Sequence, residues 1–164
     1  GKNIGIMHKA SRKIRLYRKN SFSPLKIKKL LDDINKNKIN KLSKNLASEM
    51  QNTFMEIRQG WPKTLPKNII HGDLFIDNIF FHKGKFLGFI DFYFSSNDFE
   101  AYELATCINA LCFNKRKKKF SYDKGKTLQL IKGYETIRKL QKKEKDFLNI
   151  LCKGSALRLS LIHI

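Results

Sequence analysis

The chain has 164 residues, of which 41% are hydrophobic, and this suits a single domain with a core of its own. The chain has 34 lysine and arginine residues against 14 acidic residues, which gives a net charge of +20. The excess is mostly lysine, spread along a chain rich in asparagine and isoleucine, and AT-rich coding sequences produce this composition. We therefore do not take the net charge as a sign of nucleic-acid binding. No apolar run approaches the roughly 20 residues of a membrane span, and no secretory signal peptide is visible, so we expect a cytoplasmic protein.

The first part of the chain, residues 1–62, is predicted to be helical. Ser23-Pro24 is a plausible cap and first turn for a helix over 25–39. A second helix is predicted from an apolar stripe at helical spacing, which should face the core: Leu42, Leu46, Met50, Phe54 and Ile57. The sequence Gly60-Trp61-Pro62 ends it.

The middle part, residues 63–98, is predicted to contain a β-hairpin. The stretches "NII" and "NIFF" are typical of short strands, "HKGK" at 82–85 contains the glycine that a hairpin turn favours, and "FLGFIDFYF" is the returning strand. Buried strands seldom carry loose carboxylates. We therefore expect the polar side chains within this stretch to have a functional role: His71, Asp73, Asn78 and Asp91.

The last part, residues 99–164, is predicted to consist of helices. Asn97-Asp98 is expected to cap a helix over "FEAYELATCINALCF", and amphipathic helices are expected around 128–137 and 147–161. The basic run "NKRKKKF" at 114–120 has two possible interpretations, a solvated loop after a helix end or a contact for phosphate or nucleic acid.

The polar residues of the hairpin follow a known catalytic pattern. His71, Asp73 and Asn78 are spaced as in the protein-kinase loop H-R-D-L-x-x-x-N, and Asp91-Phe92 stands where a kinase carries its metal-binding Asp-Phe. Phosphoryl transfer needs a carboxylate that receives the proton of the attacking hydroxyl, and hard oxygen ligands that hold Mg²⁺ against the phosphates of ATP. The pattern predicts Asp73 as the catalytic base, Asn78 and Asp91 as the ligands of Mg²⁺ and hence of ATP, and His71 as structural support of the loop.

Differences from the protein-kinase pattern indicate which class of kinase the sequence resembles. Gly72 replaces the arginine of the loop, Tyr93 replaces the glycine after Asp-Phe, and no Ala-Pro-Glu segment follows. These differences favour a small-molecule kinase built on the same lower lobe. The stretch Gly125-Lys126-Thr127 resembles the end of a Walker-type phosphate loop, but Phe120 occupies the position of the required first glycine, which excludes that motif.

Two stretches, "LPKNIIHGDLFIDNIFF" and "GFIDFYFSSNDFEAYELATCINALCF", resemble homoserine kinases of the aminoglycoside phosphotransferase/choline kinase-like family, which has a protein-kinase-like fold. The match is dense from about Leu65 to Phe113 and is extended weakly by "GIMHKAS" and "GSALRLSL". The resemblance implies an α+β fold class: a mainly helical C-terminal lobe with a catalytic β-hairpin. Residues 1–164 would form one partial domain of that lobe, and the β-rich N-terminal lobe would lie outside the chain.

The resemblance also implies a reaction. ATP and Mg²⁺ would be the cofactors, L-homoserine the small-molecule substrate and O-phospho-L-homoserine the product, in threonine biosynthesis. Asp73 would contact the substrate as the base, and Arg158 is either a partner for the substrate carboxylate or a surface arginine on a helix. Because the ATP-binding lysine and phosphate-covering loop of this family belong to the other lobe, we expect the fragment alone to be inactive.

Two other functions stay open at this point. One is a related kinase acting on an aminoglycoside or an amino alcohol, although this lobe offers few acidic residues for a polycation. The other is a noncatalytic, basic nucleic-acid-binding protein, for which aromatic and basic side chains should alternate on one face. Instead, the aromatic residues of 75–99 cluster with the acidic pattern, which repels phosphate unless a metal intervenes. No membrane partner is expected, and no oligomeric state follows from the sequence.

Overall fold

The computed structural model describes residues 1–21, 24–33, 36–116 and 119–163. The helices of the described chain are α1 (Lys2–Ser11), α2 (Pro24–Asp33), α3 (Lys36–Asn40), α4 (Leu46–Gly60), α5 (Glu100–Leu111), α6 (Lys124–Glu135) and α7 (Lys142–His163). The strands are β1 (Lys67–Ile70), β2 (Ile79–His82), β3 (Lys85–Phe89), β4 (Ser96–Phe99), β5 (Phe113–Arg116) and β6 (Lys119–Tyr122). No helix in the described ranges is long and apolar enough to cross a membrane.

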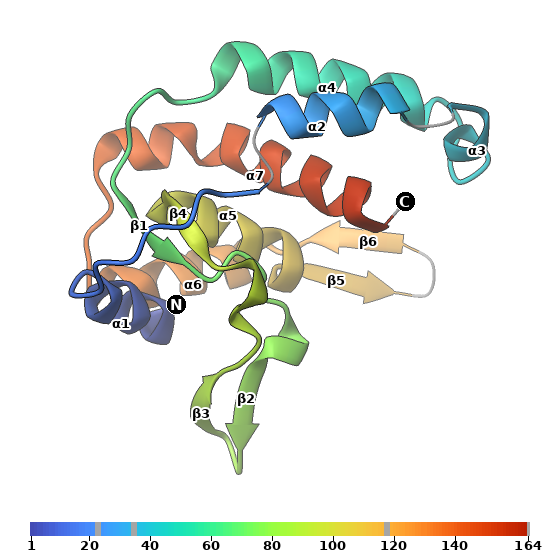
Figure 1. Cartoon of the computed structure of the whole chain (residues 1–164). Coiled ribbons are helices and arrows are strands. Elements are labelled where there is room, and N and C mark those ends of the chain that lie inside the picture. The colour runs from blue at the N-terminus through green and yellow to red at the C-terminus, as the bar shows by residue number, and fades with distance from the viewer. Residues whose placement is uncertain (22–23, 34–35, 117–118, 164) are drawn as a thin grey trace.

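Helices α5 and α7 pack against each other at the centre of the molecule (Figure 1). Helices α2 and α4 cover one side of α7, and α1 lies against α6 on the other side of the structure (Figure 1). The hairpin β2–β3 projects away from this helical body, at the bottom of the view (Figure 1). The residues between the hairpin and the body are those of the catalytic pattern.

The strands form three separate antiparallel pairs, β1–β4, β2–β3 and β5–β6. In the first pair Ile70 lies opposite Ser96, so the chain leaves β1 beside the start of β4. The β2–β3 pair turns at Lys83 and Gly84, both of which have positive φ angles (47° and 74°), as a two-residue hairpin turn requires. The pair β1–β4 therefore fixes the start of the loop 71–78, and the pair β2–β3 brings the chain back to the end of this loop.

The core anchors the catalytic loop from beneath. Leu74, which directly follows Asp73, is fully buried and packs in a cluster with side chains from α1, α5, α6 and the segment between α6 and α7: Ile4, Leu104, Cys107, Tyr134 and Leu140. Ile79 and Phe89, from the two strands of the hairpin, pack partly buried against the same cluster. Because a closely packed core resists displacement, Leu74 restrains the position of its neighbour Asp73.

The helices around the apolar stripes are present as predicted, but several details differ. The predicted helix over 25–39 corresponds to α2 and α3, while Ser23 and residues 34–35 lie outside the described residues. Leu42 precedes α4 and is 69% exposed, so its place in the core stripe was wrong. The bounds of helix α1 and the pairing of β1 with β4 were not predicted.

Two further local predictions were wrong. Asn97 and Asp98 do not cap α5; they lie in β4, and α5 follows Phe99, which makes no side-chain cap. The carboxylate of Asp98 instead accepts hydrogen bonds from the Phe99 amide (2.7 Å) and from Asn20 Nδ2 (2.6 Å). The basic run 114–120 is not a loop along most of its length: its described residues belong to β5 and β6.

Candidate active site

The loop proposed to be catalytic begins with a sharp turn at Gly72, the second residue after the end of β1. Gly72 has a φ of +78°, and a Cβ at this position would lie 3.0 Å from the carbonyl oxygen of Phe94. L-residues rarely adopt this backbone conformation, and a side chain here would also crowd a neighbouring backbone. Glycine is therefore required where the protein-kinase pattern has arginine.

Asp73 and Asn78 are held against each other. Asn78 Nδ2 donates hydrogen bonds to the backbone oxygen of Asp73 (2.7 Å) and to its carboxylate Oδ2 (3.3 Å). The backbone between them closes through Phe75 N to Asp73 O (2.9 Å) and Asn78 N to Phe75 O (3.0 Å). The half-buried Asp73 carboxylate thus has a fixed partner and a fixed direction.

Asp91 is brought to the same place by the hairpin. The backbone N–H of Ile90 donates to the carbonyl oxygen of Asn78 (3.1 Å), so Asp91 follows a residue that is bonded to Asn78. Asp91 has a φ of 59°, and its Oδ1 accepts a hydrogen bond from Tyr93 N (3.3 Å). Its side chain is exposed. The chain after β3 therefore brings the backbone that precedes Asp91 next to Asn78.

His71 connects the two sides of the site. Its buried ring contacts the carbonyl oxygen of Ile90 through Nε2 (2.8 Å), and Asp73 N donates to its Nδ1 (3.3 Å). Because a carbonyl only accepts and a backbone N–H only donates, the tautomer with its proton on Nε2 satisfies both contacts. The ring also contacts the ring of Phe92 in a tilted arrangement, with the ring centroids 4.6 Å apart. His71 thus links the loop of Asp73 to the segment that carries Asp91.

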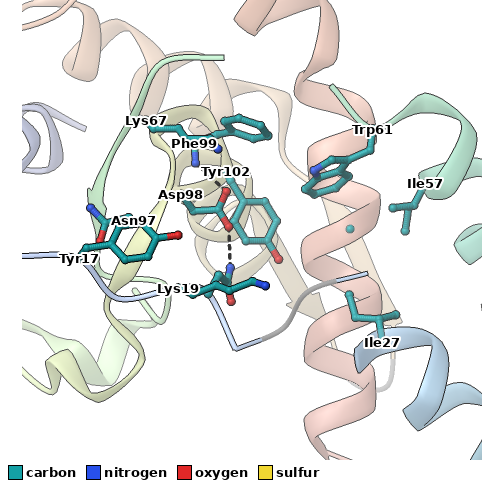
Figure 2. A pocket seen from close by; sticks show the side chains of 12 residues that line it. Tyr17, Lys19, Ile27, Ile57, Trp61, Lys67, Asn97, Asp98, Phe99 and Tyr102 are labelled. Carbon is teal, nitrogen blue, oxygen red and sulfur yellow. Dashed lines mark hydrogen bonds between the residues drawn. The ribbon is translucent and has the colours of Figure 1, made fainter. Parts of the chain in front are cut away.

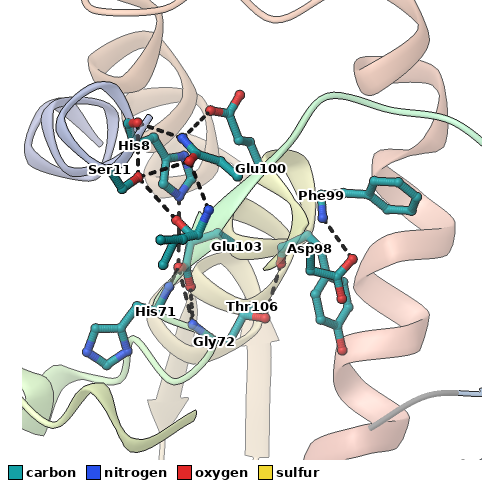
Figure 3. Close-up of polar contacts among 12 residues, drawn as sticks. His8, Ser11, His71, Gly72, Asp98, Phe99, Glu100, Glu103 and Thr106 are labelled. Carbon is teal, nitrogen blue, oxygen red and sulfur yellow. Dashed lines mark hydrogen bonds and ion pairs between the residues drawn. The ribbon is translucent and has the colours of Figure 1, made fainter. Parts of the chain in front are cut away.

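Glu103 of α5 is a further residue of the site, for which the sequence suggested only a structural charge on the face of a helix. Its fully buried carboxylate accepts hydrogen bonds from the backbone amides of His71 and Gly72, the latter at 3.1 and 3.2 Å (Figure 3). His8 Nε2, from α1, lies 3.9 Å from the same carboxylate. The sequence does contain a sign of this role: Glu103 is a charged residue between Tyr102 and Leu104 on a largely apolar helix. A charged residue in such a place needs polar partners if it is buried.

A second buried carboxylate, that of Glu100, ties the surrounding elements together. It accepts hydrogen bonds from Arg12 Nη2 (3.2 and 3.3 Å) and Asn68 Nδ2 (2.9 Å), and it forms an ion pair with Arg138 Nε (2.5 Å). Arg138 also pairs with the buried Glu144 (2.8 Å). This network joins α1, β1, α5 and the start of α7, and so supports the scaffold on which the loop rests.

Arg158 of α7 is not on the surface, contrary to one of its two predicted roles: only 2% of it is exposed. Its Nη1 donates a hydrogen bond to the carbonyl oxygen of Gly72. Its guanidinium lies 5.5 Å above the ring of Phe94 and hydrogen-bonds Tyr102. Burial raises the pKa of Tyr102 to about 12, so this hydroxyl stays protonated at physiological pH.

A cavity of about 260 Å³ is lined in part by Tyr102 (Figure 2). Its described lining combines two lysines, an aspartate, amides and aromatic rings: Tyr17, Lys19, Asn20, Ile27, Ile57, Trp61, Lys67, Asn97, Asp98, Phe99, Tyr102 and Gly154. Asp98 lies at its edge (Figure 2) and accepts a hydrogen bond from Asn20, which also lines it. The described lining includes no residue of the loop 71–78, so this cavity is separate from the site of Asp73.

The donor set suits a magnesium ion. Among the described residues, the Oδ1 of Asn78 has no hydrogen-bond partner, because its Nδ2 is the atom turned towards Asp73. The described part of the chain holds no cluster of three or more His, Cys, Asp or Glu side chains able to bind a metal. One amide oxygen and one exposed carboxylate fit Mg²⁺, which takes few protein ligands and keeps waters and phosphates; zinc would need more nitrogen or sulfur ligands.

Comparison with known proteins adds independent information. The family model described as "Phosphotransferase enzyme family" (APH) matches residues 6–137. Over the whole chain, the sequence is 40% identical to a homoserine kinase of Chelativorans sp. (strain BNC1), and 37% identical to homoserine kinases of Sinorhizobium medicae (strain WSM419) and Gluconobacter oxydans (strain 621H). It covers 50%, 49% and 51% of these proteins. The chain spans about half the length of the curated relatives it matches.

Two solved structures share the fold. Amicoumacin kinase hAmiN, in a complex with AMP-PNP, Ca²⁺ and Ami, matches 98% of this chain over 48% of its own, with a TM-score of 0.65 and 17% identity. An aminoglycoside-3'-phosphotransferase of type VIII matches 92% of this chain over 57% of its own, with a TM-score of 0.62 and 13% identity. The predicted α+β, kinase-like fold class is thereby confirmed.

Proposed function

Because the chain belongs to the phosphotransferase enzyme family, we propose that it carries the catalytic loop of a small-molecule kinase. This kinase uses ATP and Mg²⁺ to phosphorylate the side-chain hydroxyl of L-homoserine, which is a step in the synthesis of threonine. The observation that carries this proposal is the shared position of Asp73, Asn78 and the segment of Asp91. The homoserine kinases that align with the whole chain support this acceptor. The AMP-PNP and Ca²⁺ bound in a solved relative of the fold support a nucleotide and a divalent cation.

In this proposal, residues 1–164 form one partial domain, the C-terminal lobe of a longer enzyme. Residues 1–62 are its helical part, 63–98 the catalytic loop and hairpin, and 99–164 the C-terminal helices. The support is that the chain aligns over its full length with about half of each relative.

Asp73 acts as the base in the proposed reaction. Its carboxylate takes the proton of the acceptor hydroxyl while the hydroxyl oxygen bonds to the γ-phosphorus, and the bond from that phosphorus to the β–γ bridging oxygen breaks to release ADP. The hydrogen bond from Asn78 Nδ2 to Asp73 Oδ2 (3.3 Å) aims the carboxylate. Asn78 Oδ1 and Asp91 would hold the Mg²⁺, which, when bound, offsets the negative charge of the triphosphate.

The acceptor is tested by comparing four hydroxyl compounds. With the full-length enzyme, we expect kcat/KM for L-homoserine to exceed that for kanamycin, choline and L-serine. The kcat/KM for L-serine, which is one methylene shorter, should be lower by ~10- to 100-fold, because one missing methylene in a complementary binding site has an effect of this size. A coupled ADP-release assay measures all four. A preference for kanamycin or choline would refute homoserine as the acceptor and leave the kinase assignment standing.

The division between metal ligands and base predicts different responses to Mg²⁺. Asn78→Ala and Asp91→Ala should weaken Mg²⁺-dependent ATP binding as well as the rate, since both remove an oxygen that faces the cation. Raising the Mg²⁺ concentration should partly restore the activity of Asn78→Ala but not that of Asp73→Asn. Asp77→Ala, which removes an exposed carboxylate of the same loop, is the control. Equal restoration of the Asn78 and Asp73 variants would show that the two roles are wrongly assigned.

A further inference from the structure

We propose that Arg158 is a positioning residue of the catalytic loop: it fixes the peptide that leads into Asp73 and joins it to the segment after Asp91. The inference rests on the proposed role of Asp73 as the base. It replaces the role predicted from the sequence, in which Arg158 binds the carboxylate of the substrate. It follows from three features of the structure, namely the contacts of Gly72, the burial of the guanidinium and the contact with Phe94.

Gly72 is held at both of its backbone groups by buried charged side chains of opposite sign. Its N–H donates to the carboxylate of Glu103 on α5, and its carbonyl oxygen accepts from the guanidinium of Arg158 on α7. The anion thus accepts from a backbone donor and the cation donates to a backbone acceptor, and hydrogen bonds to charged groups are stronger than those between neutral groups. Since Gly72 directly precedes Asp73, its orientation sets the direction from which the Asp73 side chain leaves the backbone.

The surroundings of Arg158 have the character of a structural site. A buried guanidinium is costly unless its donors are satisfied, and the described partners of Arg158 include the Gly72 carbonyl, the Tyr102 hydroxyl and the face of the Phe94 ring. A cation over an aromatic face is itself attractive. With 2% of the residue exposed, the guanidinium offers little surface to a substrate carboxylate.

The contact with Phe94 gives Arg158 a link to the second loop. Phe94 ends the short 3₁₀ turn Phe92–Phe94 that follows Asp91, and its carbonyl oxygen lies where a Cβ on Gly72 would meet it, at 3.0 Å. Arg158 therefore touches the residue before the base and a residue shortly after the metal-binding carboxylate. Displacing it should move these two groups relative to each other, and misplacement of ~1 Å costs up to 10²-fold in rate.

The test uses the full-length enzyme with Arg158→Met, which keeps the length of the side chain and removes its charge. We expect kcat with L-homoserine to fall by ~10- to 100-fold, with its KM close to that of the wild type. The discriminating acceptor is 3-aminopropan-1-ol, which is homoserine without its carboxylate. If Arg158 positions the loop, the rates with both acceptors fall by the same factor. If it binds the carboxylate, only homoserine is affected, its KM rises, and our proposal is overturned.

A second readout does not depend on turnover. Hydrogen exchange of the backbone amides of residues 71–75 should be faster in Arg158→Met, because the loop loses a clamp, and ATP need not be present. Leu161→Ala is the matched control: Leu161 is buried on the same helix but packs in the cluster with α2 and α4. It should lower stability while leaving kcat and this exchange unchanged.

Milder variants keep the test decisive if Arg158→Met does not fold. Arg158→Lys keeps the charge but replaces the planar, forked donor with a single ammonium, and Tyr102→Phe removes one hydroxyl partner without opening a cavity. Both should give smaller losses of kcat in the same direction. Unchanged loop exchange in both would overturn the proposal. Failure of the wild-type enzyme to phosphorylate L-homoserine would count against the proposed function only, since the exchange comparison still decides the role of Arg158.

Discussion

Asp73→Asn is expected to lower the rate of phosphoryl transfer by ~10²-fold or more, with little change in the affinity for ATP. An amide has the shape of the carboxylate but takes up no proton, and its oxygen still accepts the hydrogen bond that Asn78 Nδ2 donates. The loop should therefore keep its geometry. The groups proposed to face the cation, Asn78 Oδ1 and the Asp91 carboxylate, are untouched. The chemical step alone should suffer.

The control for this variant is Asp77→Asn, which makes the same change of charge four residues along the loop. Asp77 is exposed, and its variant should retain the wild-type rate. Single-turnover measurements with saturating ATP separate the chemical step from product release. If Asp73→Asn turned over at the wild-type rate, another group would have to accept the proton.

The second large effect is expected from the 164-residue chain on its own, which should release no ADP above background with L-homoserine. In the kinases that this chain resembles, a lysine and a phosphate-covering loop from the other lobe complete the grip on ATP. Positioning and electrostatic stabilisation account for nearly all catalysis of phosphoryl transfer. A chain that supplies only one of the two groups of ATP-binding residues should therefore be slower than the full-length enzyme by orders of magnitude. Calorimetry should detect only weak binding of Mg²⁺-ATP.

The surface around the site agrees with this expectation. Large apolar side chains of the loop and hairpin are exposed there: Ile76, Phe80, Phe81, Leu87, Ile90, Phe92 and Tyr93. Exposed apolar patches of this kind mark surfaces that contact another part of a protein, and they favour aggregation when left uncovered. The isolated chain should therefore be less soluble than the full-length enzyme. Measurable turnover by the isolated chain would show that it contains a complete nucleotide site.

The loop proposed to be catalytic could be located from the sequence because its residues lie close together in the chain. His71, Asp73 and Asn78 occupy one short loop, so their spacing alone fixes their relation, and the glycine at the hairpin turn indicated that Asp91 returns to them. For Glu103 and Arg158, the contacts with Gly72 could not be predicted from the sequence, for the opposite reason. These two residues contact Gly72 from helices that are 31 and 86 residues away in the chain, and helical periodicity says which face is buried but not what it touches.

The same distinction applies to the fold. The apolar stripes of α4, α5, α6 and α7 were visible as local periodicity. Strand β4 was not, because Asn97-Asp98 matches the residue types of a helix cap, while its partner β1 lies far back in the chain. The pairing with β1 and the hydrogen bond from Asn20 to Asp98 decide its conformation, and neither is encoded in a short stretch of sequence.

The central claim is that this site transfers a phosphoryl group to the hydroxyl of L-homoserine, and phosphorus NMR of the reaction products tests it most directly. The full-length enzyme, incubated with ATP, Mg²⁺ and L-homoserine, should give ADP and one new phosphomonoester signal that couples to the two protons of the terminal methylene. The Asp73→Asn variant should give neither in the same time. ADP accompanied only by inorganic phosphate, or an ester signal of equal intensity from Asp73→Asn, would contradict the account.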